Sequence, residues 1–215
     1  LTADAIKKHP GAFYLGIYIW CGAVVLYFNM GYDKSFPTWF NEYVMNIFSR
    51  GIFSTATFMV VMFLGTITKH NKLSRKLMGV RGEISIMGSL IVLSHNVVFG
   101  VQYFPILFTN PKAMPTRQMI ASIITLCLLA MLIPLFITSF KSVRRRMSGK
   151  TWKNVQRLAY PFFIGIYVHV MVLYSADVRS HLTGIIVYTA IYGSYVVLRL
   201  RKAVLKARKT RMATV

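Results

Sequence analysis

The stretch RLAYPFFIGIYVHVMVLY, residues 157–174, decides the fold. It is apolar over nearly the length that a helix needs to cross the hydrocarbon core of a bilayer, about 20 residues. One ionisable side chain, His169, lies well inside it. Because an imidazole buried in hydrocarbon without a partner costs several kcal/mol, His169 needs a ligand, a hydrogen bond or a water-filled cavity.

A second apolar run, residues 84–108, contains His95 in an equivalent position. If both runs begin at the same face of the membrane, each histidine lies 11 residues from the start, counted from Ile84 and from Leu158. At a rise of ~1.5 Å per residue, both imidazoles lie roughly 16 Å deep, near the middle of the bilayer. Two histidines at matched depth on parallel helices can hold one metal centre from opposite sides.

The composition places the whole chain in a membrane. Of the 215 residues 55% are hydrophobic, and the mean hydropathy is +0.53. A window of about 19 residues predicts six spans, at residues 12–30, 47–68, 84–108, 118–140, 158–175 and 182–198. We therefore expect an all-α, polytopic membrane protein, with residues 1–215 forming one six-helix transmembrane domain and residues 199–215 a short basic cytoplasmic tail.

The charge pattern orients this domain. With 26 Lys and Arg against 5 Asp and Glu, the net charge is +21, which in a soluble protein would suggest nucleic acid. Here only five basic residues, Lys34, Arg50, Lys112, Arg117 and Arg179, fall on one side of the alternating spans. The others lie on the opposite side: Lys7, Lys8, Lys69, Lys72, Arg75, Lys76, Arg81, Lys141, Arg144, Arg145, Arg146, Lys150, Lys153, Arg157, Arg199, Arg201, Lys202, Lys206, Arg208, Lys209 and Arg211. The positive-inside rule predicts a multi-pass protein of the cell membrane that contacts lipid, has both termini in the cytoplasm and binds no nucleic acid.

Helical spacing predicts what surrounds each buried histidine. The face of His95 carries Gly88, Ile91, Val92, Val98 and Phe99, and the face of His169 carries Phe162, Gly165, Ile166, Val172 and Leu173. Such an apolar wall suits a porphyrin, and a glycine would let the macrocycle approach the backbone. The alternative is that the glycines allow tight helix packing and each histidine bonds a neighbouring helix.

The other candidate residues are fewer. His9 and His70 lie among basic residues and are expected to be solvated, whereas His181, at the edge of the last span, is an alternative ligand or a proton entry group. No carboxylate lies within the predicted spans, which argues against the Asp/Glu relays of ion-coupled transporters. The sequence contains no glycine-rich nucleotide-binding motif.

Several short motifs carry a resemblance to a known family. They are the block ITSF at residues 137–140, the three arginines Arg144, Arg145 and Arg146, the block WKNVQRLAY at residues 152–160, and His169. These motifs resemble the ferric reductase-like transmembrane family, and within it the heme-binding membrane subunits of bacterial methionine-sulfoxide reductase systems. The resemblance covers residues 82–174. It implies heme b between the third and fifth spans, with His95 and His169 as axial ligands of the iron. It also implies electron flow from a cytoplasmic quinone or flavin, such as FMN, to an extracytoplasmic oxidoreductase.

The chain departs from this family at one position. Family members commonly have a second histidine in the fifth span, thirteen residues before the ligand, and here that residue is Gln156. The matching positions of the third span are Arg81 and Gly82. An amide is a poor iron ligand, so we expect one heme and another carrier on its cytoplasmic side. The basic residues near this position can hold heme propionates or a flavin phosphate, or only interact with lipid head groups: Arg81, Arg144, Arg145, Arg146, Lys150 and Arg157.

The leading hypothesis is therefore an electron-transfer subunit of an oxidoreductase, with His95 and His169 on a heme iron. Three alternatives stay open: a proton- or ion-conducting transporter in which both histidines carry protons, a direct ferric reductase, and a membrane scaffold whose histidines only pack.

Overall fold

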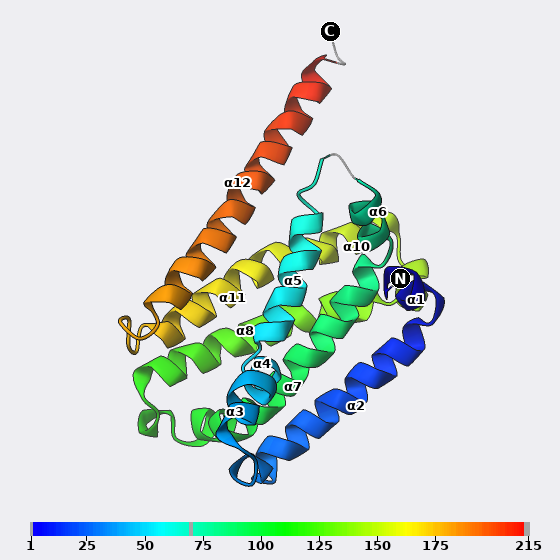
Figure 1. Ribbon diagram of the computed structural model, residues 1–215. Helices are drawn as coiled ribbons and strands as arrows, with labels where there is room; N and C mark the ends of the chain where they lie inside the picture. The colour runs from blue at the N-terminus through cyan, green and yellow to red at the C-terminus, as the bar shows by residue number, and fades with distance from the viewer. Residues whose placement is uncertain (1, 69–70, 213–215) are drawn as a thin grey trace.

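A computed structural model describes residues 2–68 and 71–212 of the protein, and the part that it describes contains helices and no strands (Figure 1). Five of its helices, one of them counted from residue 149 to 174, are long and apolar enough to cross a membrane. The long helices are α2 (Pro10–Asn29), α7 (Arg81–Thr109), α8 (Thr116–Ser139), α11 (Ala159–Tyr174) and α12 (Leu182–Met212). This architecture confirms a polytopic all-α membrane protein.

The second predicted span differs from the prediction. Instead of one helix over residues 47–68, the chain forms α4 (Asn46–Ser49) and α5 (Ile52–Leu64), and the helix through residues 38–49 meets α5 at an angle of 45°. The bend lies at Gly51, whose φ of +73° is a left-handed conformation that other residues adopt only with strain. α4 is preceded by α3 (Thr38–Phe40) and by η2 (Asn41–Met45), a π-helical turn. The break matters for the site, because it leaves the carbonyl of Ser49 outside the regular hydrogen-bond ladder.

The short helices gather at the ends of the bundle. At one end, which we call the basic end, lie α1 (Thr2–Lys8), α6 (Lys72–Gly79), α9 (Lys141–Arg145) and α10 (Gly149–Gln156), and α12 projects beyond them (Figure 1). The opposite end carries η1 (Tyr32–Lys34) and η3 (Pro111–Ala113). Asn71 caps α6 by accepting a hydrogen bond from Ser74 N, and Ser148 caps α10 by accepting one from Thr151 N. Lys69 and His70 lie outside the described residues.

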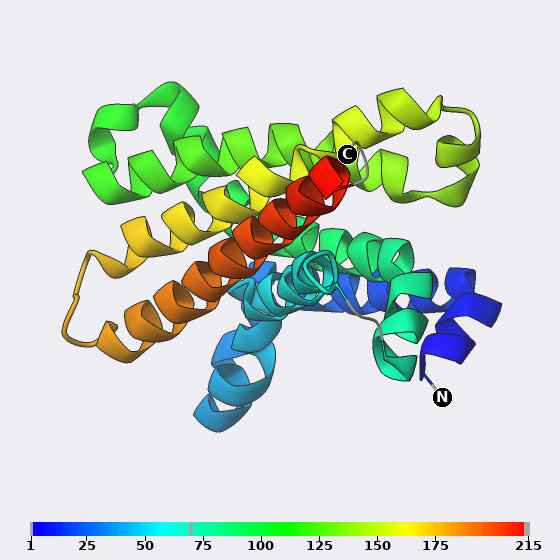
Figure 2. The same ribbon diagram turned by 90° about the horizontal axis from the view of Figure 1, so that it is seen from above.

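The long helices pack in the order α2, α7, α8, α11 and α12, and α5 closes the arrangement by contacting both α7 and α11 (Figures 1 and 2). α8 and α5 each contact both α7 and α11, so these two helices hold α7 and α11 in place relative to one another. The buried core is rich in aromatic side chains. Its members are Phe58, Met62, Leu132, Leu135, Phe162, Phe163, Ile166, Tyr192 and Tyr195. Phe163, fully buried, stacks on Tyr192 with ring centroids 4.4 Å apart.

The outer surface of the bundle is apolar. Large hydrophobic side chains are exposed along α2, α8 and α12, for example Leu15 (60% exposed), Ile133 (54%) and Val197 (65%). A soluble monomer does not expose apolar surface over this many helices, whereas lipid is a suitable solvent for it.

α12 extends past its predicted end at residue 198 and continues as helix through most of the predicted basic tail, to Met212. Lys202 fixes this extension to the bundle, because its Nζ donates to Gly65 O at 2.8 Å and to Ile67 O at 3.0 Å. These carbonyls follow α5, so the lysine supplies the positive charge that the C-terminal end of a helix favours.

Candidate functional site

Two cavities lie inside the bundle, one after the other along its length. The one farther from the basic end has a volume of about 590 Å³ and is lined by residues of α5, α7, α8 and α11. Both His95, from α7, and His169, from α11, line it. We call it the histidine cavity. The structure thus brings together the two histidines that the sequence analysis paired.

The ring of His95 is held in one tautomer by the break in the second span. Its Nδ1 lies 2.6 Å from the carbonyl oxygen of Ser49, the last residue of α4. A carbonyl oxygen accepts only, so Nδ1 carries the proton and donates it. Gly51, whose Cβ position lies 3.6 Å from the His95 ring, sets the chain direction that presents this carbonyl. The remaining ring nitrogen, Nε2, therefore has its lone pair unprotonated.

The ring of His169 is held in the same tautomer by α8. Thr125 Oγ1 donates to Ala121 O at 2.8 Å, so its hydroxyl proton is already used. His169 Nδ1 lies 3.3 Å from the same Oγ1, and a hydroxyl whose proton is used can only accept. His169 thus also carries its proton on Nδ1 and keeps the Nε2 lone pair.

This arrangement fits a heme. Iron-ligating histidines bind through one ring nitrogen and donate the other N–H to a carbonyl or another acceptor, which fixes ring orientation. In the part of the chain that the structure describes, no group of three or more His, Cys, Asp or Glu side chains is placed to hold a metal ion. Three imidazoles line this cavity, those of His95, His169 and His181, and the first two have Nδ1 hydrogen-bonded to the protein. Two buried oxygens of lining residues, Asn96 Oδ1 and Gln118 Oε1, have no hydrogen-bond partner in the described part of the chain, as expected where a bound group or water supplies one.

Gly88 and Gly165, which the sequence analysis placed beside the two histidines, do not line the histidine cavity. A Cβ on Gly88 would lie 2.9 Å from Thr57 Cγ2 of α5, and one on Gly165 would lie 2.8 Å from Leu128 Cδ2 of α8. Neither glycine lines the histidine cavity, so the interpretation that they admit a macrocycle is wrong and the alternative of close helix packing holds. The predicted apolar wall is present in part, through Val92, Phe99, Phe162, Ile166 and Leu173.

The structure separates the other predicted residues. His181 lines the histidine cavity at its exposed edge, where its ring stacks on Tyr174 with centroids 4.7 Å apart. His9 is exposed at the start of α2. Arg157 is exposed, donates to Asn154 Oδ1 and lines neither cavity. Three other predicted cations are exposed in the same way: Arg145, Arg146 and Lys150.

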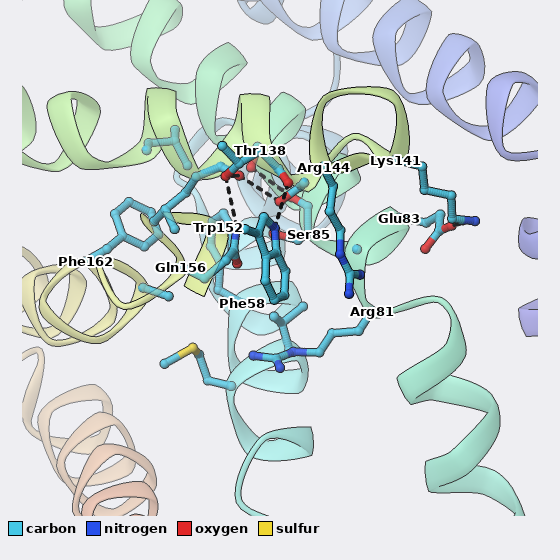
Figure 3. A pocket seen from close by; sticks show the side chains of 18 of the residues that line it. Phe58, Arg81, Glu83, Ser85, Thr138, Lys141, Arg144, Trp152, Gln156 and Phe162 are labelled. Atoms are coloured by element: carbon cyan, nitrogen blue, oxygen red, sulfur yellow. Dashed lines mark hydrogen bonds and ion pairs between the residues drawn. The ribbon is translucent and has the colours of Figure 1, made fainter. Parts of the chain in front are cut away.

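The second cavity, about 390 Å³, lies at the basic end and is lined by both Arg81 of α7 and Arg144 of α9 (Figure 3). We call it the arginine cavity. Its wall includes Gln156, whose Nε2 donates to Thr138 Oγ1 at 3.0 Å, and Trp152, whose Nε1 donates to Thr138 O at 3.1 Å. The Arg144 guanidinium lies over the Trp152 ring, 4.2 Å from its centroid. Gln156, which stands where the resemblance led us to expect a second histidine, thus lines a separate chamber.

Sequence reasoning missed a buried carboxylate in this chamber. Because α7 begins at Arg81 rather than at residue 84, its first turn includes Glu83, which is only 4% exposed. The prediction that no carboxylate lies within a span is therefore wrong for α7. Glu83 Oε1 lies 2.5 Å from Lys141 Nζ, and the lysine side chain is 58% exposed. The one feature of the sequence that could have revealed Glu83 is its position directly before the apolar run that begins at Ile84.

A layer of three apolar side chains separates the cavities. Phe58, Leu132 and Phe162 line both of them. Phe58 and Phe162 meet edge to face with ring centroids 5.2 Å apart. Groups bound in the two cavities would therefore lie on opposite faces of the same side chains.

Comparison with known proteins gives two similarities. The chain is 34% identical over 207 residues to an uncharacterized protein of Treponema pallidum, a match that covers 94% of this chain and 57% of that protein. It is 34% identical over 83 residues to the protein-methionine-sulfoxide reductase heme-binding subunit MsrQ of Rhodospirillum rubrum, a match that covers 39% of this chain and 38% of that protein. The chain thus spans little more than half the length of the first relative and less than half of the second. No family model and no solved structure matches it.

The second similarity partly supports the resemblance drawn from the motifs. It joins the chain, over a limited region, to a subunit that is named for heme binding. The apolar helices and this similarity together indicate a multi-pass membrane protein.

Proposed function

We propose that the protein is a heme b-binding membrane subunit that passes electrons across the bilayer, with His95 Nε2 and His169 Nε2 as axial ligands of the iron. One observation carries the proposal: imidazoles from two helices line one cavity, and each has its Nδ1 proton bonded to the protein so that Nε2 is left to coordinate. When bound, heme supplies a one-electron carrier whose potential depends on ligands and surroundings.

The residues around the two cavities define how the ligands are held and where electrons enter and leave. Ser49 and Thr125 orient the ligands, and the apolar wall excludes water. With the basic end in the cytoplasm, electrons enter from a quinone or flavin at the arginine cavity and leave toward an extracytoplasmic oxidoreductase on the opposite side. The partial similarity to a subunit named for heme binding supports the heme in this proposal.

A proton-conducting transporter is the competing function, and the buried Glu83 is the feature that favours it. Proton carriers need an unbroken chain of groups that exchange protons. Between Glu83 and the two histidines, the described residues that line both cavities are Phe58, Leu132 and Phe162, which exchange none. Electrons can cross such a layer, whereas protons cannot, so electron transfer is the better account.

Reduced-minus-oxidised difference spectra of the purified protein test the proposal. We expect b-type bands in the wild type and their complete loss in His95→Ala and in His169→Ala, while His9→Ala, which removes an exposed histidine, keeps them. Equal elution of all four proteins in size-exclusion chromatography shows that loss of the bands is not loss of the fold. A wild type without bands, or bands that persist in both cavity variants, would overturn the proposal.

A further inference from the structure

The arginine cavity has polar groups that the histidine cavity lacks. Its charged lining residues are three cations and one carboxylate: Arg81, Arg144, Lys141 and Glu83. No imidazole lines it within the described chain, and its volume is about two thirds of that of the other cavity. It is therefore unsuited to a second heme held by histidines and fits a smaller ring.

Two groups in this cavity can bind the oxygens of such a ring. The Arg81 guanidinium makes no hydrogen bond or ion pair with the described part of the chain, although the residue is partly buried and lines the cavity. The Oε1 of Gln156 accepts no hydrogen bond there either, because the amide contacts Thr138 through Nε2. Arg81 can donate to a ring oxygen, which is a hydroxyl in a quinol and a carbonyl in a flavin, and Gln156 can accept from a ring O–H or N–H.

Glu83 supplies a third capability. A carboxylate this deeply buried costs several kcal/mol unless it is paired, and Lys141 supplies the pairing. Part of its role is structural, because a negative charge in the first turn of α7 interacts favourably with the helix dipole and stabilises the helix. The pair also joins the cavity wall to solvent, because Glu83 is buried while Lys141 is more than half exposed. A proton accepted at Glu83 thus has a polar route out of the protein at the basic end.

We infer that the arginine cavity binds the electron donor as a hydroquinone ring, the reduced form shared by membrane quinols and by reduced flavin, and that Glu83 accepts a proton released when the ring is oxidised. This inference rests on the proposed function for the electron acceptor. Each ring loses two electrons and two protons. The two electrons would pass one at a time to the heme held by His95 and His169, with the first handed on to the extracytoplasmic oxidoreductase before the second arrives, and the protons leave through Glu83 and Lys141 to the solvent. Among the described residues, the side chains that line both cavities are those of Phe58, Leu132 and Phe162, and the electrons would cross this layer.

Rapid mixing under anaerobic conditions tests the role of Glu83. Menadiol, reduced FMN and dithionite are each mixed with oxidised wild type, Glu83→Gln, Glu83→Asp and Glu42→Gln, and heme reduction is followed. We expect Glu83→Gln to keep its heme and its reduction by dithionite but to be reduced at least about tenfold more slowly by a hydroquinone. Glu83→Asp should recover part of the rate, and Glu42→Gln, in the exposed η2 segment at the opposite end, should match the wild type.

The two donors distinguish the sources of the ring. A Glu83 effect confined to menadiol identifies a quinol, and one confined to reduced FMN identifies a flavin. If Glu83→Gln is reduced at the wild-type rate by both donors, the inference is overturned. That result would mean that Glu83 has only a structural role and accepts no proton from the ring.

A binding measurement separates this inference from the proposed function. Trp152 lines the cavity, so oxidised menadione or FMN bound there should quench its fluorescence, and Arg81→Ala or Arg81→Lys should weaken the quenching. If the wild type holds no heme yet binds one of these rings through Arg81, the proposed function fails and the cavity assignment stands. If neither ring binds to wild-type protein, the cavity assignment fails whatever the heme spectra show.

Discussion

The histidine cavity and the arginine cavity differ in how their polar groups are arranged, although the same four helices contribute to both. In the first, His95 donates its Nδ1 proton to Ser49 O and His169 donates its Nδ1 proton to Thr125 Oγ1. In the second, the Arg81 guanidinium has no hydrogen-bond or ion-pair partner among the described residues, and the buried carboxylate of Glu83 is paired with Lys141, which reaches solvent. The first arrangement fixes lone pairs for a metal, and the second can exchange protons with a ligand. A few polar groups in an apolar bundle thus decide what each chamber can hold.

The layer between the cavities keeps these two chemistries apart, so removing it is the most severe test of the comparison. Phe162→Ala deletes a ring that is 5% exposed, packs against Phe58 and lines both cavities. We expect the free energy of unfolding to fall by about 3–5 kcal/mol, because a truncated core aromatic loses its contacts and leaves a cavity. Unfolding by a denaturing detergent, followed by circular dichroism, measures this change.

The matched control for this change is Phe53→Ala on α5, since that ring is 42% exposed. Its free energy of unfolding should stay within about 0.5 kcal/mol of the wild type. Equal losses in the two variants would show that Phe162 is not a central part of the packing between the cavities.

A smaller effect is expected from the hydrogen bond that orients His169. Thr125→Val preserves the side-chain volume closely but removes the oxygen that accepts from His169 Nδ1. We expect heme affinity to fall about 10–100-fold, as is usual when an outer-shell partner of a ligating histidine is lost. Titration of the heme-free protein with hemin measures the affinity.

Thr57→Val is the appropriate comparison for that titration. Thr57 Oγ1 bonds a carbonyl four residues earlier on its own helix, as Thr125 does, but lines neither cavity. Its affinity for heme should equal that of the wild type. An unchanged affinity in Thr125→Val would mean that the tautomer of His169 is set by something other than α8.

The sequence predicted the parts of this structure that depend on long apolar runs. Five spans and the pairing of His95 with His169 follow from hydrophobic length and matched depth, because a helix in lipid needs a fixed number of residues. The break at Gly51 was not predicted, since hydropathy does not detect one residue with a positive φ. Without that break, the carbonyl that fixes His95 could not be foreseen.

The arginine cavity was predicted in part. Arg81 and Arg144 were named among the cations for heme propionates or a flavin phosphate, and Gln156 was named only as a departure from the family. Glu83 was excluded because the predicted span began one residue later, at Ile84. Helix boundaries are the least certain feature of a sequence pattern, and here the error concealed the carboxylate that gives the cavity its acid–base chemistry. The roles of Gly88 and Gly165 were misassigned because spacing places a residue on a face without showing which neighbour covers it.

The smallest effect concerns a second ion pair at the basic end. Asp4 of α1 lies 2.6 Å from Lys76 of α6, and this hydrogen bond and charge hold the pKa of the Asp4 carboxyl below its ordinary value of 3.8. A group whose folded-state pKa is lowered stabilises the fold above its ordinary pKa and loses that contribution as the pH falls through the lowered value. Melting temperatures of the wild type and Asp4→Asn should therefore differ slightly near neutral pH, begin to converge below about pH 4, and coincide only below the lowered pKa of Asp4.

The exposed ion pair of Asp4 and Lys76 also tests whether any negative charge at the basic end affects the rate of heme reduction. Unlike Glu83, Asp4 lines neither cavity and is well exposed, so salt and water screen its interaction. Asp4→Asn should keep the wild-type rate of heme reduction by a hydroquinone at every pH, and added salt should remove most of its effect on melting. A rate as low as that expected for Glu83→Gln would mean that the net charge of this end, rather than a proton acceptor inside the cavity, controls electron entry.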